Sequence, residues 1–286
     1  MRFLMLGSVE LHGESGVISL GGTRQSSLVA ALLLTPRHGL STAELAAAVW
    51  GEEPLSGPAD AVRASVLRLR KSLDSIEFGG GQRLVKSRGG YSLTVQSNEC
   101  DVTSFAEHVG TARKAAGNGD FERAVAEFQR AIELWRGPAL AGARGPFARM
   151  HAARLNESKL EVLGEKIELE LKLGKPGALA ELRALTSEHR THEGLHAQLM
   201  AALYRSGQPA AALAVFHTVR RELVEQVGAE PGPVMRDLQQ RILAHDPGLL
   251  PASVPAPARG AAAVVTSAIC ACGRTLSWPE AATRVS

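Results

Sequence analysis

The stretch VRASVLRLRKSL, residues 62–73, decides how the first part of this chain folds. Its apolar residues recur at i, i+4, i+7 and i+11, a spacing that predicts one narrow apolar stripe along a helix. The stripe consists of Val62, Val66, Leu69 and Leu73. At about 100° per residue, Arg68 and Lys71 point away from that stripe. We therefore expect a helix that packs one face against a core and presents a basic face outward.

Two shorter helices are expected before this one. Residues 24–34 carry apolar side chains at helical spacing, and Pro36 and Gly39 end that helix. Residues 41–44, Ser-Thr-Ala-Glu, match the capping box, in which a hydroxyl and a carboxylate each accept a hydrogen bond from a free backbone amide. This box leads into a second helix over residues 45–50, which the Gly- and Pro-containing stretch 51–58 separates from the third.

Short β-strands are expected on both sides of the three helices. Residues 1–20 alternate apolar and other side chains around Gly7 and a turn at residues 12–16, which predicts a small antiparallel sheet. Residues 83–95 form two β-rich runs about Gly89 and Gly90, which predicts a hairpin. Strands, three helices and a terminal hairpin, in this order, indicate a winged helix-turn-helix.

Positive charge is concentrated in the predicted third helix and hairpin. Residues 60–90 hold seven basic and three acidic residues, a net charge of +4, whereas residues 1–59 have a net charge of −2. The whole chain carries only +3. For any single arginine a solvated surface position is the more frequent role, but a set gathered on two adjoining elements favours DNA.

The fit of these elements to a duplex assigns roles to their side chains. A helix with small and long basic side chains outward fits the major groove, about 12 Å wide, and a basic hairpin beside it reaches the backbone or the minor groove. Arginine binds guanine edges with two hydrogen bonds, lysine is a point charge for phosphate, and a helix N-terminus offers amide donors. The predicted base-reading residues are Arg63, Ala64, Leu67 and Arg68. The predicted phosphate and wing contacts are Arg24, Ser41, Thr42, Arg70, Lys71, Lys86 and Arg88.

From Cys100 onward the chain is alanine-rich and predicted to be helical. A pattern of glycine, alanine and phenylalanine recurs 88 residues later, and a weaker copy lies 33 residues before the second one, close to the roughly 34-residue tetratricopeptide period. The patterns are Gly119, Ala124 and Phe128, then Gly207, Ala212 and Phe216, with Gly174 and Pro176 in the weaker copy. We expect stacked helix pairs in a curved array, with the two phenylalanines in the interhelical core.

The predicted fold class is mainly α with a small β component. At 286 residues the chain is long enough for two domains. We expect a winged helix-turn-helix in residues 1–98 and an all-α, tetratricopeptide-like helical-repeat domain in residues 99–245. Residues 246–286 have a linker-like, proline-rich composition without helical or strand periodicity, and a disordered tail is expected there.

Several ordered motifs resemble those of one known family. In the first half they are Phe3–Gly7, the Val-Trp-Gly-Glu-Glu-Pro run at 49–54, Leu67–Leu73 and Gly89–Tyr91. In the second half they are the Leu-Trp-Arg-Gly-Pro-Ala-Leu run at 134–140 and the Pro-Gly-Pro run at 231–233. Over roughly the first 245 residues the chain resembles the Streptomyces antibiotic regulatory proteins, which join an OmpR-type winged helix to a bacterial transcriptional activation domain.

The resemblance implies a pathway-specific activator of secondary-metabolite, or antibiotic, biosynthesis genes. Such a protein binds direct repeats in double-stranded DNA near promoters as a side-by-side homodimer. It recruits RNA polymerase holoenzyme, with the sigma factor and the C-terminal domain of the alpha subunit as expected contacts. This chain departs from the pattern at Arg63 and Ala64, where relatives often carry polar uncharged side chains, so its sequence preference is expected to differ.

Composition and motifs exclude several other classes of protein. No apolar run approaches the roughly 20 residues that cross a bilayer, so no membrane role is expected. Three cysteines and the absence of a signal-like N-terminus predict a cytoplasmic, nucleoid-associated protein. The sequence holds no phosphate loop, dinucleotide-binding, nucleophile-elbow or zinc-protease motif, so we expect neither catalysis nor a cofactor.

Metal binding and two other architectures are also considered. Cys270 and Cys272 have no further ligand nearby, and His189, His192 and His196 have no evident acidic or cysteine partner, so no metal site is expected. Neither a receiver domain nor an ATPase module is expected. The alternative function is a helical-repeat adaptor whose winged helix contacts protein rather than DNA.

Overall fold

The computed structural model describes residues 1–13, 16–18, 20–35, 39–51, 57–87 and 90–250. The chain opens with the expected antiparallel sheet, in which β1 (Arg2–Leu4), β2 (Glu10–Gly13) and β3 (Gly16–Ile18) lie in the order β1-β2-β3. Phe3 faces Leu11 across the first pair, and both side chains are fully buried. The alternation of the first residues therefore buries one face of the sheet, as predicted.

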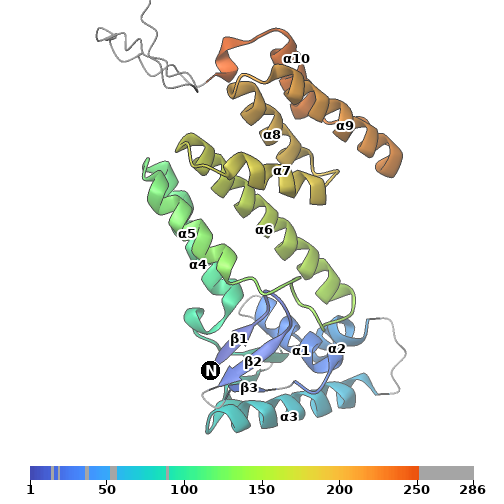
Figure 1. The fold of residues 1–286 in the computed structure, drawn as a ribbon. Coiled ribbons are helices and arrows are strands. Elements are labelled where there is room, and N and C mark those ends of the chain that lie inside the picture. The colour runs from blue at the N-terminus through green and yellow to red at the C-terminus, as the bar shows by residue number, and fades with distance from the viewer. Residues whose placement is uncertain (14–15, 19, 36–38, 52–56, 88–89, 251–286) are drawn as a thin grey trace, which may run out of the picture.

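Three helices follow, α1 (Thr23–Leu34), α2 (Thr42–Trp50) and α3 (Pro58–Ile76), and they lie against the sheet (Figure 1). The capping box is confirmed, because Ser41 Oγ accepts from the Glu44 amide at 3.2 Å and the Glu44 carboxylate accepts from the Ser41 amide at 2.8 Å. The predicted stripe of α3 is buried in the core with at most 3% exposure. It consists of Val62, Val66, Leu69 and Leu73.

A two-stranded wing completes this half of the molecule. Strands β4 (Leu84–Ser87) and β5 (Gly90–Leu93) pair antiparallel, and Tyr91 of β5 exchanges two backbone hydrogen bonds, 2.8 and 2.9 Å long, with Leu40. Gly90 has φ 129°, and a Cβ there would collide with the carbonyl of Leu40, so this close crossing requires glycine. Strands, three helices and a wing form the winged helix-turn-helix.

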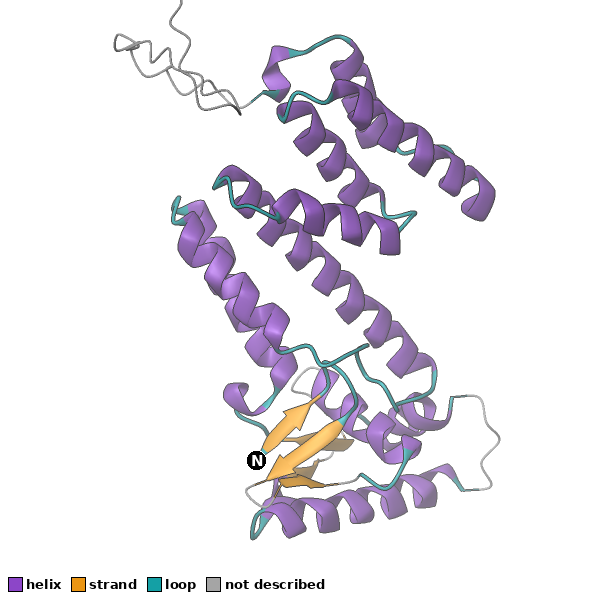
Figure 2. Cartoon of the chain, viewed as in Figure 1, coloured by secondary structure: helices purple, strands orange, loops and turns teal. Residues whose placement is uncertain are grey.

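Seven helices make the described remainder of the chain, and they stack largely as neighbouring antiparallel pairs (Figure 2). Their bounds are α4 (Asp101–Gly117), α5 (Phe121–Glu133), α6 (Pro146–Lys172), α7 (Ala178–Glu188), α8 (Glu193–Arg205), α9 (Pro209–Val227) and α10 (Pro233–Leu243). Gly119, Gly174 and Gly207 all have φ between 66° and 80° and make the turns within three successive pairs. The repeat seen in the sequence is thus a repeated left-handed turn that favours glycine.

The interhelical cores contain the two recurring phenylalanines. Phe128 is 1% exposed in the core of α4, α5 and α6, and Phe216 is 5% exposed in the core of α7–α10. The packing role that we predicted for both residues is confirmed.

The two halves share a continuous core across the predicted boundary at residues 98 and 99. Segment 136–141 pairs with segment 5–9 through backbone hydrogen bonds, among them Arg136 N to Leu6 O at 2.7 Å and Leu140 N to Met5 O at 2.9 Å. Ala139 and Leu140 are buried in the same cluster as the winged-helix residues. The winged helix and the first helices of the array therefore form one packed unit.

The end of the described chain differs from the expected tail. Residues 246–250, which we assigned to a disordered segment, pack against the array. Asp246 accepts from Arg241 Nε at 2.7 Å and caps a short helical turn at Pro247–Leu249, and Leu249 is 7% exposed. A single buried leucine after a proline-containing turn leaves no periodicity to detect, which is why composition placed the boundary too early. Residues 251–286 lie outside the described part of the chain.

Candidate nucleic-acid interface

The outer face of α3 carries the predicted base-reading residues side by side. Ala64 and Arg68 are exposed, and Leu67 keeps 55% of its surface exposed between them. The side chain of Arg63 is 65% exposed and pairs with Asp60 one turn earlier, at 2.9 Å. Exposed ion pairs of this kind contribute little to stability, so Arg63 can exchange Asp60 for another acceptor. The structure thus brings these residues together on one solvent-facing surface.

The predicted phosphate contacts on α3 and on the wing include two exposed lysines. Lys71 and Lys86 are both exposed, and the Lys86 ammonium lies 6.0 Å from the centre of the Tyr91 ring. Arg88, the third predicted wing contact, lies outside the described residues. Lys71 thus extends the exposed face of α3, and Lys86 is an exposed lysine of the wing.

Arg70 holds the helix and the wing together. Its Nη2 donates to the carbonyl oxygen of Leu84, the first residue of β4, at 2.8 Å. Gln25 of α1 makes a comparable contact, since its amide nitrogen donates to the carbonyl of Ser65 at 3.2 Å. These bonds fix α3 relative to α1 and to the wing, so the position of the outer face of α3 beside the wing is set by the protein itself. The sequence motifs indicated Arg70 as a phosphate contact and did not reveal this positioning role.

The N-terminus of α2 is partly occupied by its own cap. Of its four free first-turn amides, those of Ser41 and Glu44 already donate within the capping box, so Thr42 and Ala43 supply the remaining two. The Ser41 hydroxyl and amide hold the pKa of the Glu44 carboxyl below its ordinary value, so a negative charge stays at this end. The capping box thus leaves the Thr42 and Ala43 amides as the remaining donors at this end of α2, next to the charged Glu44 carboxylate. Arg24 is exposed in the first turn of α1.

Arg83 forms ion pairs with two carboxylates. It was one of the seven basic residues counted in residues 60–90. Its Nη1 donates to both oxygens of Glu99, at 2.7 and 2.9 Å, and its Nη2 donates to Glu77 at 3.1 Å. The hydrogen bond from Arg83 and its charge oppose burial and hold the pKa of Glu99 below its ordinary value. Only 23% of the Arg83 side chain is exposed. Arg83 therefore anchors the base of the wing, and the basic surface contains fewer accessible charges than the sequence count suggests.

The Arg136 side chain and the buried Asp101 carboxylate join the sheet to the helical array. Asp101 accepts from the amides of Met5 and Leu6 at 2.7–2.8 Å, and Arg136 lies 3.6 Å from Asp101 and 2.9 Å from Glu10. Burial raises the pKa of Asp101, and the two amides and Arg136 oppose that shift. This junction fastens α4 and the segment that follows α5 to the sheet region.

The histidine pattern does not assemble a metal site in the described part of the chain. His192 caps α8 through Nδ1 and contacts Glu157 at 3.2 Å, while His196 is buried in the helical core. Among residues 1–250 outside the gaps, no group of three or more His, Cys, Asp or Glu side chains is placed to hold a metal ion. Cys270 and Cys272 lie outside the described residues. Within the same described ranges, no helix is long and apolar enough to cross a membrane.

Comparison with known proteins supports the assignment of both halves. Residues 100–243 match the family model of the bacterial transcriptional activator domain. The regulatory protein AfsR of Streptomyces coelicolor is 39% identical over 251 residues, which cover 87% of this chain but only 25% of AfsR. The regulatory protein DnrI of Streptomyces peucetius is 33% identical over 256 residues, 87% of this chain and 94% of DnrI.

A solved structure has the same fold over most of the described chain. Mycobacterium tuberculosis EmbR, in complex with a low-affinity phosphopeptide, superposes with a TM-score of 0.78 at 32% identity and covers 86% of this chain and 65% of that one. The winged helix, the helical array and their order are thus shared with proteins named as transcriptional regulators. The chain belongs to the Streptomyces antibiotic regulatory protein family of transcriptional regulators.

Proposed function

We propose that this protein activates transcription by binding duplex DNA with the outer face of α3, while the wing contacts the adjoining backbone. The supporting observation is that Ala64, Leu67, Arg68 and Lys71 are exposed on the face of α3 opposite its core stripe, while Lys86 is exposed on β4, the strand to which Arg70 of α3 is bonded. A helix exposed along its length in this way fits the major groove. The family of regulators to which the chain belongs makes DNA the reasonable ligand.

The side chains of this surface fall into two groups, those suited to contact base edges and those suited to contact phosphates. Base edges would be read by the guanidinium groups, and the small or apolar side chains between them would contact thymine methyl groups. The base-reading set is Arg63, Ala64, Leu67 and Arg68. Phosphates would be held by Arg24, Thr42, Lys71, Lys86 and Arg88, with Ser41 and Arg70 keeping α2 and the wing in position as well as adding polar contacts.

The targets follow from the family and from symmetry. Direct repeats near promoters of secondary-metabolite genes present the same face of the duplex in the same orientation, so two protomers would bind side by side through a heterologous contact rather than across a twofold axis. The bound array would then recruit RNA polymerase holoenzyme through the sigma factor and the C-terminal domain of the alpha subunit. A protein with this activity is expected on the nucleoid.

Salt dependence measures the phosphate contacts that the proposal requires. With about four phosphates neutralised per protomer, log K should fall against log salt concentration with a slope near −4 per protomer, because each contact releases counterions and contributes about −0.9. Fluorescence anisotropy on a labelled duplex from upstream of the protein's own gene gives this slope between about 50 and 200 mM salt. A slope near zero would contradict phosphate binding.

Because Arg83 is paired with two carboxylates, we expect its substitution to change the stability of the protein more than its affinity for DNA. Arg83→Gln removes a positive charge next to the wing but also breaks the bonds to Glu99 and Glu77. We expect the free energy of unfolding to fall by about 1–2 kcal/mol, as for loss of a charge-assisted hydrogen bond. DNA affinity should change less than threefold at temperatures where the variant is folded. Chemical denaturation and anisotropy measure the two quantities, and a large loss of affinity in the folded variant would show that Arg83 also binds phosphate.

A gel shift on the same upstream duplex distinguishes an activator from a helical-repeat adaptor. The activator should form a complex that excess non-specific DNA does not displace. An adaptor whose winged helix contacts protein should show only weak binding that the competitor removes.

A further inference from the structure

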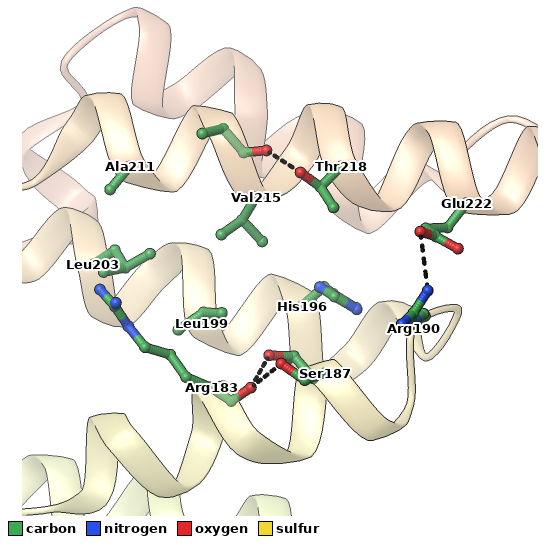
Figure 3. Close-up of a pocket in the computed structure, with 12 residues that line it drawn as sticks. Arg183, Ser187, Arg190, His196, Leu199, Leu203, Ala211, Val215, Thr218 and Glu222 are labelled. Atoms are coloured by element: carbon green, nitrogen blue, oxygen red, sulfur yellow. Dashed lines mark hydrogen bonds and ion pairs between the residues drawn. The ribbon is translucent and has the colours of Figure 1, made fainter.

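A cavity of about 560 Å³ lies between α7, α8 and α9, in the half of the molecule remote from the winged helix (Figure 3). Its apolar walls come from Leu199 and Leu203 of α8 and from Ala211 and Val215 of α9. The volume is within the range of about 300–1,000 Å³ that small-molecule sites occupy. Helices α7, α8 and α9 wall this cavity, and its remaining side is open to solvent.

Two arginines of the α7 region give the cavity an anionic preference. Arg183 extends along the wall toward Leu203, and its guanidinium has no ion-pair partner among the described residues (Figure 3). Arg190 lies 3.8 Å from Glu222, a long contact for an ion pair, and 66% of its side chain is exposed. Two cations face one carboxylate here, so the lining has a net charge of +1 with His196 neutral.

His196 is a buried residue of the cavity wall. It is 6% exposed, and neither ring nitrogen makes a hydrogen bond within the described residues. Burial lowers its pKa, while the nearby carbonyls of His189 and Arg190 oppose that shift. The imidazole is therefore held neutral, with one donor and one acceptor nitrogen. Both ring nitrogens are covered by protein atoms, so His196 contributes to the wall of the cavity and offers no free polar atom to its interior.

We infer that this cavity binds a small organic anion with an apolar, ring-sized body. Its acidic group would pair with Arg183, and its body would lie on Leu199, Leu203 and Val215. The other groups of the lining already have partners of their own. Thr218 donates to the Ala214 carbonyl at 3.0 Å, and Ser187 donates to the Arg183 carbonyl at 3.0 Å. The site is independent of the proposed DNA surface and adds a ligand to the regulator.

The test uses 8-anilinonaphthalene-1-sulfonate, a fluorescent aromatic anion, as the probe on the full chain. We expect saturable one-to-one binding. Arg183→Met, which keeps the length and loses the charge, should weaken binding about tenfold or more, as for loss of a charge-assisted hydrogen bond. Ala214→Trp should abolish it, because Ala214 lines the cavity at an exposed helix position where a large side chain fills the opening without entering the core.

Two control variants and one pair of competitors make the result decisive. Arg221→Met removes an exposed arginine of α9 that does not line the cavity, and Val224→Trp adds a ring at an exposed residue of the same helix; neither should change the titration. 2-Naphthoate should displace the probe at least tenfold more effectively than 2-naphthol. The inference is overturned if wild type gives no saturable binding, if all four variants titrate alike, or if the two naphthalenes compete equally. Circular dichroism confirms that each variant is folded.

Discussion

An Asp101→Ala variant should lose about 3–5 kcal/mol of unfolding free energy, the largest stability effect that we predict for a single side chain. The Asp101 carboxylate has 1% of its surface exposed and accepts the amide hydrogens of Met5 and Leu6. Removing it leaves both amides buried without an acceptor and leaves Arg136 facing one fewer carboxylate. Urea denaturation followed by circular dichroism measures the loss.

A second aspartate provides the matched control for this variant. Asp120 caps α5 by accepting from the Arg123 amide at 3.2 Å, but at an exposed site. Asp120→Ala should therefore cost only about 1 kcal/mol. Asp101→Asn, which keeps one acceptor oxygen, should fall between the two. Equal losses for Asp101→Ala and Asp120→Ala would show that Asp101 does not join the sheet to the array as described.

Arg68→Ala should weaken binding to the preferred DNA sequence by about 1–3 kcal/mol, roughly fivefold to 150-fold, and should flatten the base preference at one position. Arg68 is exposed in the middle of the outer face, and its Nε makes a long hydrogen bond, 3.4 Å, to the carbonyl of Ala64 in its own helix. The Arg68 guanidinium is therefore available to form hydrogen bonds with a guanine edge. Lys71→Ala should instead weaken all sequences alike, since a phosphate contact does not depend on the base.

Competition binding against a library of single-base variants of the site separates the effect of Arg68→Ala on base preference from the effect of Lys71→Ala on overall affinity. For Arg68→Ala, the ratio between the best and the substituted sites should shrink at one base pair. For Lys71→Ala, every ratio should stay as in wild type while all affinities drop. If Arg68→Ala preserved every ratio, Arg68 would belong with the phosphate contacts.

The periodic parts of this fold could be predicted from sequence because their cause is local. The α3 stripe, the capping box at Ser41 and the turn glycines each depend on residues within a few positions of one another, and apolar spacing or backbone conformation decides them. The order of elements then limited the topology to a winged helix followed by helix pairs.

The side chains that fasten the elements together could not be predicted in this way. Arg83 pairs with Glu99 and Asp101 bonds to Met5, contacts across 16 and 96 residues that no local pattern records. A count of basic residues treats Arg83 and Lys71 alike, although one is fixed between carboxylates and the other faces solvent. The burial of His196 likewise exists only once α7, α8 and α9 have packed.

A charge-reversal comparison tests most directly whether the outer face of α3 and the wing form the DNA-binding surface. Lys71→Glu/Lys86→Glu places two negative charges on that surface, while Lys114→Glu/Lys175→Glu makes the same change in net charge at exposed lysines of the helical array. Anisotropy on the upstream duplex at fixed salt should show a loss of about a hundredfold or more for the first pair and about threefold or less for the second, because exposed charges act mainly within a Debye length of about 10 Å. Equal losses in the two variants, or a larger loss from the array, would contradict this assignment of the surface.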